Sequence, residues 1–218
     1  MKQSFDLVVF DWDGTLVDST DPIAESLKQA CADLGLATPS DHDARYVIGL
    51  GFEEAVRHLA PQLHADRYPQ LVERYRAHYS SASSRVKPFP GVIEGLRALR
   101  AAGFLIAVAT GKSRRGLDRS LDDSGVRRYT NATRCADEGL PKPHPDMLNW
   151  LMTKLEVDKN RTLMIGDTTH DLQMARNAGV ASIAATYGAH SQSMLEEYKP
   201  LACLSSFREF LQWAQLDD

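Results

Sequence analysis

Cysteine is scarce in this 218-residue sequence, and the three cysteines form no recognisable pair. Cys31, Cys135 and Cys203 lie far apart along the chain, without a Cys-x-x-Cys spacing. Disulfide frameworks and zinc sites are read from close or repeated cysteine spacings, which this sequence lacks. We therefore expect buried or incidental thiols at these three positions.

Long apolar runs and an excess of basic charge are also missing. No uninterrupted apolar segment is long enough to cross a bilayer, and the first residues show a strand pattern without a signal-peptide layout. We expect a cytoplasmic protein with no membrane partner. Lysine and arginine total 25 against 29 acidic residues, a net charge of −4, so no global basic field favours binding to nucleic acid.

Hydrophobic residues make up 43% of the sequence, which is enough for a substantial core. From residue 90 onward, apolar runs typical of strands alternate with segments typical of helices. The expected strands cover residues 7–10, 104–109, 131–134, 162–165, 181–185 and 201–204. The expected helices cover residues 92–102, 113–123, 145–155 and 172–178, with a last helix at 207–213. This alternation predicts an α/β fold with a Rossmann-like, mostly parallel sheet flanked by helices.

Residues 17–85 lack strong strand patterns and are predicted to form several amphipathic helices. Apolar residues recur at helical spacing from Ile23 to Leu34. The other expected segments are a short segment reaching Tyr46, a helix from Phe52, a helix at 66–79 and a loop or fraying helix end at 80–84. The sequence therefore predicts a core formed by residues 1–16 and 86–218, with an inserted α-helical cap between them.

Two carboxylates follow the first apolar run directly. Asp11 and Asp13 come after residues 7–10, at the C-terminal mouth of a predicted buried strand, where open α/β sheets bind ligands. One acid can attack an electrophile or hold a hard cation while the other moves a proton. For the pair alone, a calcium-binding loop and a solvated turn are alternatives.

Further polar residues follow later apolar runs in a consistent order. Thr110 and Gly111 follow one predicted strand, Asp167 and Asp171 follow another, and Lys142 lies between them ahead of a predicted helix. Because parallel strands carry their active loops on one edge, we expect these residues to converge near Asp11. Taken singly, each has a structural alternative as a strand end, an exposed lysine or a helix cap.

Four motifs in this order resemble the haloacid dehalogenase superfamily of hydrolases, in the capped phosphatase branch that includes phosphoglycolate phosphatases. The similarity covers essentially the whole chain. The matching positions are residues 11–19 for the first motif, Thr110 for the second, Lys142 for the third, and Gly166, Asp167 and Asp171 for the fourth. Residues 87–92 also resemble the segment by which the chain of this family re-enters its core after the cap.

The resemblance implies a role for each of these residues. Asp11 would be the nucleophile that forms an aspartyl-phosphate, and Asp13 would be the acid and base. Thr110, Gly111 and Lys142 would bind the phosphoryl group. The implied cofactor is Mg²⁺, and its ligands would be Asp11, the backbone carbonyl of Asp13, Asp167 and, directly or through water, Asp171.

The resemblance implies a Mg²⁺-dependent phosphomonoesterase for a small phosphorylated metabolite, with 2-phosphoglycolate as the leading candidate. The cap segment at 47–52 resembles that of phosphoglycolate phosphatases, so Gly49, Gly51 and Arg45 are candidates for selecting the substrate, with Lys87 as a further anion contact. A simple turn is the alternative for the two glycines. Phe52 stands where related sugar-phosphate mutases usually have arginine, which disfavours a mutase.

Several alternatives stay open. A β-phosphoglucomutase-like phosphoryl transferase and a pyrophosphatase would share this chemistry. A phosphoacceptor signalling module would be phosphorylated once instead of turning over. Residues 111–113 match the end of a P-loop, but Ile106 occupies the place of its first glycine. The oligomeric state stays open, and a monomer is compatible with the sequence.

Histidine gives no metal-binding pattern. His170 lies inside the fourth motif at a position that the family does not require, and we expect it to be a solvated turn residue. The other histidines considered lack the spacing of metal ligands: His42, His58, His64 and His78.

Overall fold

The computed structural model describes residues 5–216 and contains a six-stranded sheet in which every neighbouring pair of strands is parallel. The strands lie in the order β3-β2-β1-β4-β5-β6. Their bounds are β1 Leu7–Phe10, β2 Leu105–Thr110, β3 Ala132–Cys135, β4 Thr162–Gly166, β5 Ala181–Ala185 and β6 Cys203–Leu204. The chain therefore builds the sheet outward from β1 in both directions, which makes the carboxyl end of β1 a switch point where such sheets bind ligands.

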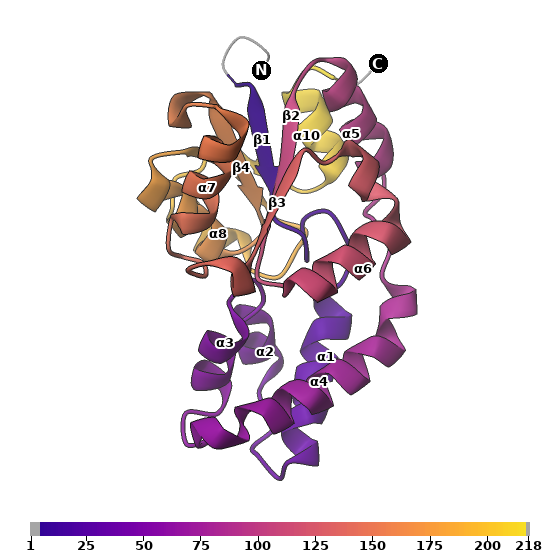
Figure 1. Ribbon diagram of the computed structural model, residues 1–218, viewed down its shortest axis with the longest axis vertical. Helices are drawn as coiled ribbons and strands as arrows, with labels where there is room; N and C mark the ends of the chain where they lie inside the picture. Colours follow the sequence, from indigo (N-terminus) through magenta and orange to yellow (C-terminus); the bar gives the residue numbers. More distant parts are fainter. Residues whose placement is uncertain (1–4, 217–218) are drawn as a thin grey trace.

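Helices cover both faces of this sheet (Figure 1). The side chains of β1 alternate between the two faces, and Val8 and Phe10 join one hydrophobic cluster while Leu7 and Val9 join the other. The first cluster includes residues of α5 Val92–Ala101, α6 Arg114–Ser124 and α10 Phe207–Trp213. The second includes residues of α7 Asp146–Leu155 and α8 Thr169–Ala178. The predicted α/β fold, with a parallel sheet between helical layers, is confirmed.

Most boundaries agree with the expected ones within one or two residues, and α8 is the main exception. The sequence predicted a helix from residue 172, whereas α8 begins at Thr169. Thr168 caps it, because its hydroxyl accepts a hydrogen bond from the Asp171 backbone N–H while the Asp171 carboxylate accepts one from the Thr168 N–H. This capping box places Asp171 in the first helical turn.

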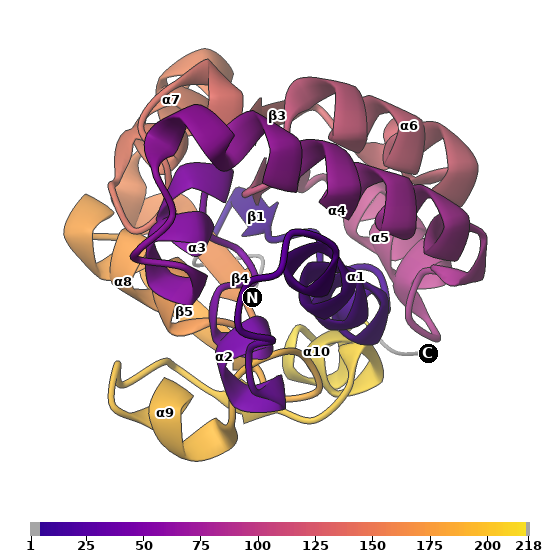
Figure 2. The same cartoon turned by 90° about the horizontal axis from the view of Figure 1, so that it is seen from below.

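The segment between β1 and α5 forms four helices beyond the carboxyl ends of the strands (Figures 1 and 2). They are α1 Thr20–Asp33, α2 Asp41–Tyr46, α3 Phe52–Leu59 and α4 Tyr68–Ala82. Helices α1 and α4 pack against each other, and residues such as Cys31, Val56 and Leu71 form a small core of their own. We propose that these helices form the cap, with the boundaries at 16/17 and 85/86 still a prediction.

Residues 80–84, expected to be a loop or a fraying helix end, form the end of a helix and not a loop. Helix α4 continues to Ala82, and a short 3-10 helix, η2 Ser83–Arg85, follows directly. None of the helices within residues 5–216 combines the length and the apolar composition of a membrane span.

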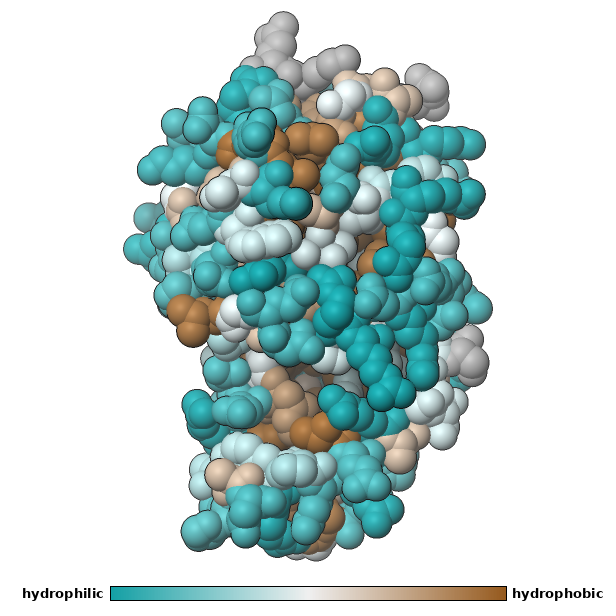
Figure 3. All heavy atoms as spheres, in the orientation of Figure 1, coloured by the Kyte–Doolittle hydropathy of each residue, from teal (hydrophilic) through white to brown (hydrophobic). Residues whose placement is uncertain are grey.

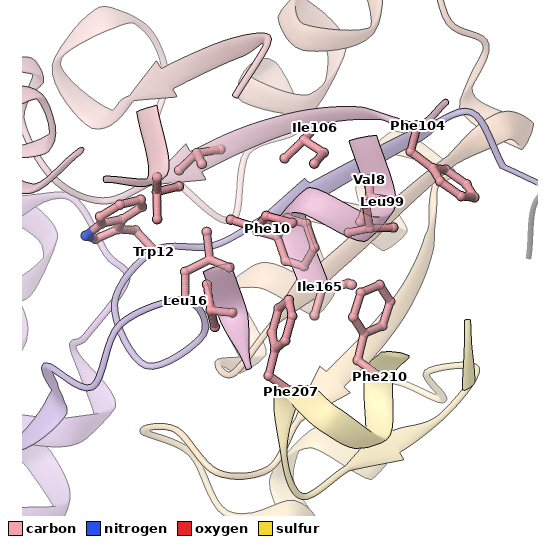
Figure 4. Packing of buried hydrophobic residues seen from close by; sticks show 14 of the residues in the cluster. Val8, Phe10, Trp12, Leu16, Leu99, Phe104, Ile106, Ile165, Phe207 and Phe210 are labelled. Atoms are coloured by element: carbon pink, nitrogen blue, oxygen red, sulfur yellow. The ribbon is translucent and has the colours of Figure 1, made fainter. Parts of the chain in front are cut away.

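Aromatic side chains of α10 pack against Phe10 at the carboxyl end of β1 (Figure 4). The ring of Phe10 lies 5.9 Å from that of Phe207 and 5.7 Å from that of Phe210, measured between centroids. Both partners come from α10, near the end of the chain. Because Phe10 immediately precedes Asp11, this contact also determines where the first carboxylate lies.

We expect Phe210→Ala to lower the free energy of unfolding by about 3–5 kcal/mol, because it removes a buried ring and leaves a cavity. Phe210 is only 2% exposed. Urea unfolding followed by circular dichroism would measure the change. Leu201→Ala is the control, since Leu201 is 57% exposed and should lose little. Similar losses for the two variants would contradict this account of the core.

Candidate active site

The residues predicted to converge come from the carboxyl ends of adjacent strands. Asp11 follows β1, Thr110 ends β2, and Asp167 follows β4. Strand β1 pairs with both β2 and β4, so all three side chains lie at the same edge of the sheet. Each of the three residues is fully buried.

Lys142 joins two of the acids from the loop before α7. Its ammonium lies 2.7 Å from Asp11 Oδ1 and 2.6 Å from Asp171 Oδ1. All three side chains are buried, so the charges are not screened by water. Burial by itself lowers the pKa of Lys142, but the carboxylates of Asp11 and Asp171 outweigh it and raise the pKa above its usual value. The lysine is therefore a permanent cation at the centre of the site.

Three carboxylates gather around this lysine closely enough to hold a metal ion. Asp11, Asp167 and Asp171 each offer an oxygen, and these oxygens lie within 4.8 Å of one another. Burial raises the pKa of Asp11 well above its usual value, against the opposing charge of Lys142. Burial and then the charge of Asp171 raise the pKa of Asp167 to about 7. The protein alone thus disfavours full ionisation of this cluster, and a hard dication with oxygen ligands would restore it.

One carboxylate oxygen supports the same conclusion. Asp11 Oδ2 is buried and has no hydrogen-bond partner among the described residues. Buried polar atoms are nearly always paired, so an unpaired carboxylate oxygen beside two other acids fits a cation or a reacting group. The residues present therefore fit a metal ion.

Small residues and hydrogen bonds hold Asp167 in place. Thr15 donates to Oδ1 at 2.6 Å, and the Ala189 backbone N–H donates to Oδ2 at 2.8 Å. A Cβ on Gly14 or on Gly188 would overlap this carboxylate. Gly14 also has a φ of +81°, which favours glycine. After β1, Gly14 therefore leaves the space that the Asp167 carboxylate occupies, and Thr15 donates the hydrogen bond that orients it.

Asp13 lies apart from the three acids. It accepts a hydrogen bond from Ser19 Oγ at 2.7 Å, and Lys112 Nζ lies 3.0 Å from its Oδ1. Lys112 also donates to the Tyr79 hydroxyl at 3.3 Å. Burial lowers the pKa of Lys112, but the charge and hydrogen bond of Asp13, together with Tyr79 and Tyr75, outweigh burial and raise the pKa overall. The sequence analysis considered Lys112 only as part of a failed P-loop match and missed this contact.

The two cap glycines lie against loops of the core. A Cβ on Gly111 would lie 2.6 Å from the carbonyl oxygens of Gly49 and Leu50. Gly49 has a φ of +90°, and a Cβ there would lie 3.3 Å from Thr168 Oγ1. A Cβ on Gly51 would lie 3.1 Å from Pro141 Cβ. The segment of Gly49 to Gly51 therefore approaches the core closely, whereas its role in selecting the substrate stays a prediction.

The other candidate anion contacts are occupied or exposed. Arg45 pairs with Asp21 and, at 3.2 Å, with Asp41, and it donates to Thr20 Oγ1 at 3.3 Å. All these partners belong to the cap segment, so the guanidinium is used within the cap. Lys87 is exposed where the chain returns to the core.

The expectation for His170 is wrong, because this residue is buried in the first turn of α8 against the cap. Its Nε2 lies 2.8 Å from the carbonyl oxygen of Tyr46, and His190 Nε2 lies 3.0 Å from the same oxygen. His190 Nδ1 accepts from the Thr169 backbone N–H, so its Nε2 carries the proton and donates to Tyr46. Two core histidines thus hold one cap carbonyl. No pattern in the sequence pointed to His190.

Without bound metal, we expect the free energy of unfolding to fall as the pH rises from about 4 to about 7. The pKa of Asp167 is about 7 in the fold, against 3.8 for the free carboxyl, so over this window the folded state keeps a proton that the unfolded chain has lost. This contribution to the free energy of unfolding, up to roughly 4 kcal/mol, is fully present below the unfolded pKa of 3.8 and is lost above the folded pKa of about 7. Urea unfolding of metal-stripped protein at several pH values measures it.

Asp167→Asn provides the control, because it removes the titrating group and keeps the shape. Its stability should depend less on pH over the same window. Equal slopes for wild type and variant would show that Asp167 does not carry the effect.

Comparison of the sequence and the structure with those of known proteins identifies a family. The sequence model of the haloacid dehalogenase-like hydrolases matches residues 8–185. The Dickeya dadantii protein named "Probable phosphatase IndB" is 37% identical over 208 residues, covering 93% of this chain and 90% of the relative. A phosphoglycolate phosphatase of Agrobacterium fabrum is 34% identical, covering 87% and 84%. A crystal structure described as a predicted phosphoglycolate phosphatase, from Haemophilus somnus, superimposes with a TM-score of 0.84 at 26% identity, covering 97% and 98%.

Proposed function

We propose that this protein hydrolyses phosphomonoesters in a Mg²⁺-dependent reaction that passes through a phosphorylated Asp11. The chain belongs to the haloacid dehalogenase-like hydrolase family and is a phosphatase. The observation that carries this proposal is the environment of Asp11. Lys142 donates a hydrogen bond to one of its oxygens, and the other is buried without a hydrogen-bond partner in the part of the chain that the structure describes. A carboxylate oriented by a cation, with one oxygen free to react, is what nucleophilic attack on phosphorus requires.

The first half-reaction transfers the phosphoryl group to the enzyme. Asp11 forms a bond to phosphorus while the bond between phosphorus and the ester oxygen breaks. Asp13 donates its proton to the departing alkoxide, which leaves as an alcohol. Of the four acids, only Asp13 lines the cavity between core and cap, so the alcohol part of the substrate lies on its side.

The second half-reaction uses the same two residues. Asp13, now ionised, accepts a proton from a water molecule as that water attacks phosphorus, and the bond to Asp11 breaks. Ser19 and Lys112 orient the Asp13 carboxylate for both transfers. The products are inorganic phosphate and the regenerated Asp11.

For the metal, we propose Mg²⁺ held by Asp11, Asp167 and the backbone carbonyl of Asp13, with Asp171 binding directly or through water. When bound, the ion would neutralise the repulsion between the phosphoryl oxygens and the buried acids. Lys142 adds a positive charge to the same oxygens, and Thr110 and Gly111 supply hydrogen-bond donors at the end of β2.

Among named substrates, 2-phosphoglycolate leads because several relatives are named phosphoglycolate phosphatase. A relative named pyrophosphatase PpaX, 28% identical, keeps pyrophosphate as the second candidate. A mutase and a signalling module remain testable alternatives. The cytoplasmic location stays a prediction, and the oligomeric state stays open. Phosphate release from 2-phosphoglycolate, pyrophosphate and hexose phosphates, with and without Mg²⁺, distinguishes these functions.

We expect Asp11→Asn to abolish phosphate release, because the amide cannot attack phosphorus. The loss should reach the detection limit of a phosphate assay, while the circular dichroism spectrum stays that of the wild type. Asp18→Asn is the matched control, since Asp18 is an exposed acid of the same loop and its loss should not change turnover. Turnover by the Asp11 variant at the wild-type rate would remove it as nucleophile.

Asp13→Asn should lower kcat for alkyl phosphates by about 10²- to 10⁴-fold, because the alkoxide then leaves without a proton. An aryl phosphate has a better leaving group, so phosphorylation of Asp11 should persist while hydrolysis of the intermediate stays slow. Rapid-quench kinetics should then show about one equivalent of phenol released in a burst. Near-normal steady-state rates on both ester types would exclude Asp13 as the acid and base.

A further inference from the structure

A cavity of about 520 Å³ extends from Asp13 into the space between the core and helices α1, α3 and α4. Its cap side is largely apolar, and Figure 3 shows apolar surface in the hollow between the upper and lower parts of the molecule. Sites that hold whole organic molecules have volumes of this order. A two-carbon leaving group such as glycolate would fill only a small part of it.

We propose that the substrate is a phosphomonoester whose alcohol carries a planar, uncharged ring, and that this ring lies in the cavity against Phe52, Tyr75 and Tyr79. The inference rests on the proposed phosphatase function, because the ring is placed by a phosphoryl group bound at Asp11. The names of several relatives suggest 2-phosphoglycolate as the substrate, whereas this inference favours a phosphomonoester of a larger alcohol than glycolate.

The first argument is a row of aromatic rings along the cavity. The centroids of Phe52 and Tyr75 lie 6.0 Å apart, and those of Tyr75 and Tyr79 lie 5.7 Å apart with only 18° between their planes. All three residues line the cavity. Burial raises the pKa of Tyr75 and of Tyr79, so both phenols are neutral at neutral pH. A continuous aromatic wall without negative charge suits stacking with a flat ring.

The second argument is the distribution of charge. Lys112, which lines the cavity beside Asp13, is already paired with that carboxylate. The arginines that line the cavity, Arg76, Arg115 and Arg119, are exposed to solvent. Ile23, Leu27 and Leu50 add apolar surface from the cap. The cap side of the cavity is therefore apolar, and the charged lining residues are Asp13 and Lys112 at its inner end, the three exposed arginines and the exposed Asp123.

The third argument is that the cavity persists although the cap already touches the core. The Tyr46 carbonyl is held by His170 and His190, and the backbone at Gly49 leaves no room for a side chain on Gly111. These contacts are on the side of α2 and α3, next to the catalytic residues. The cavity along α4 is thus present even though the part of the cap near α2 and α3 is already in contact with the core.

The test compares 2-phenylethyl phosphate with ethyl phosphate. Both are esters of primary alkyl alcohols, so the leaving groups are closely matched and only the ring differs. Burial of a ring should raise kcat/KM for 2-phenylethyl phosphate by about 10- to 100-fold over ethyl phosphate. Equal values, or a preference for ethyl phosphate, would overturn the proposal.

A variant tests where the ring lies. Val72 is half-buried on α4 and lines the cavity, so Val72→Trp should fill part of it and reduce the preference for the ring at least tenfold. Ala77→Trp adds the same bulk to an exposed position of α4 away from the cavity, and it should keep the wild-type preference. An unchanged preference in Val72→Trp would contradict the placement of the ring in this cavity.

A binding measurement separates this proposal from the proposed reaction. The phosphonates 2-phenylethylphosphonate and ethylphosphonate have no ester bond to break, and calorimetry with Mg²⁺ gives their affinities. Tighter binding of the ring compound, without hydrolysis of any ester, would sustain the cavity proposal and reject the phosphatase mechanism. Hydrolysis of both esters with equal kcat/KM, together with equal phosphonate affinities, would reject the ring and sustain the mechanism.

Discussion

The site depends on one buried ammonium group, that of Lys142, which lies between the carboxylates of Asp11 and Asp171. Without it, the protein would bury several acids with no cation of its own, and burial would favour their protonated, unreactive forms. The charge of the lysine opposes the rise that burial causes in the pKa of Asp11, and Asp11 Oδ2 is left without a hydrogen-bond partner among residues 5–216. The ammonium group of Lys142 thus offsets part of the free-energy cost of burying the three acids.

The rest of the fold positions this cluster from two directions. The sheet sets the spacing of Asp11 and Asp167 through the parallel pairing of β1 with β4. The capping box at Thr168 then turns Asp171 toward Lys142. The aromatic contact of Phe10 with α10 packs the same carboxyl end of β1 against the helical layer below the sheet edge. Chemistry and stability therefore share the same short strand.

Much of this arrangement could be predicted from sequence, because strands and their loop residues follow local rules. The apolar run before Asp11 was enough to place it at the carboxyl end of a strand. The contact between Lys112 and Asp13, and that between His190 and Tyr46, join segments far apart in sequence, and no local pattern encodes them. The ion pairs of Arg45 with two cap carboxylates were likewise not predicted, and its role in selecting the substrate stays a prediction.

Of the four acids of the described site, Asp13 alone lines the cavity, whereas Asp11, Asp167 and Asp171 are fully buried. In the proposed reaction, the departing alcohol and the incoming water therefore share one passage. Water reaches the phosphoryl group only after the alcohol has moved aside. The residence time of the alcohol then sets how often the phosphoryl group returns to it, and an alcohol that binds well slows its own hydrolysis.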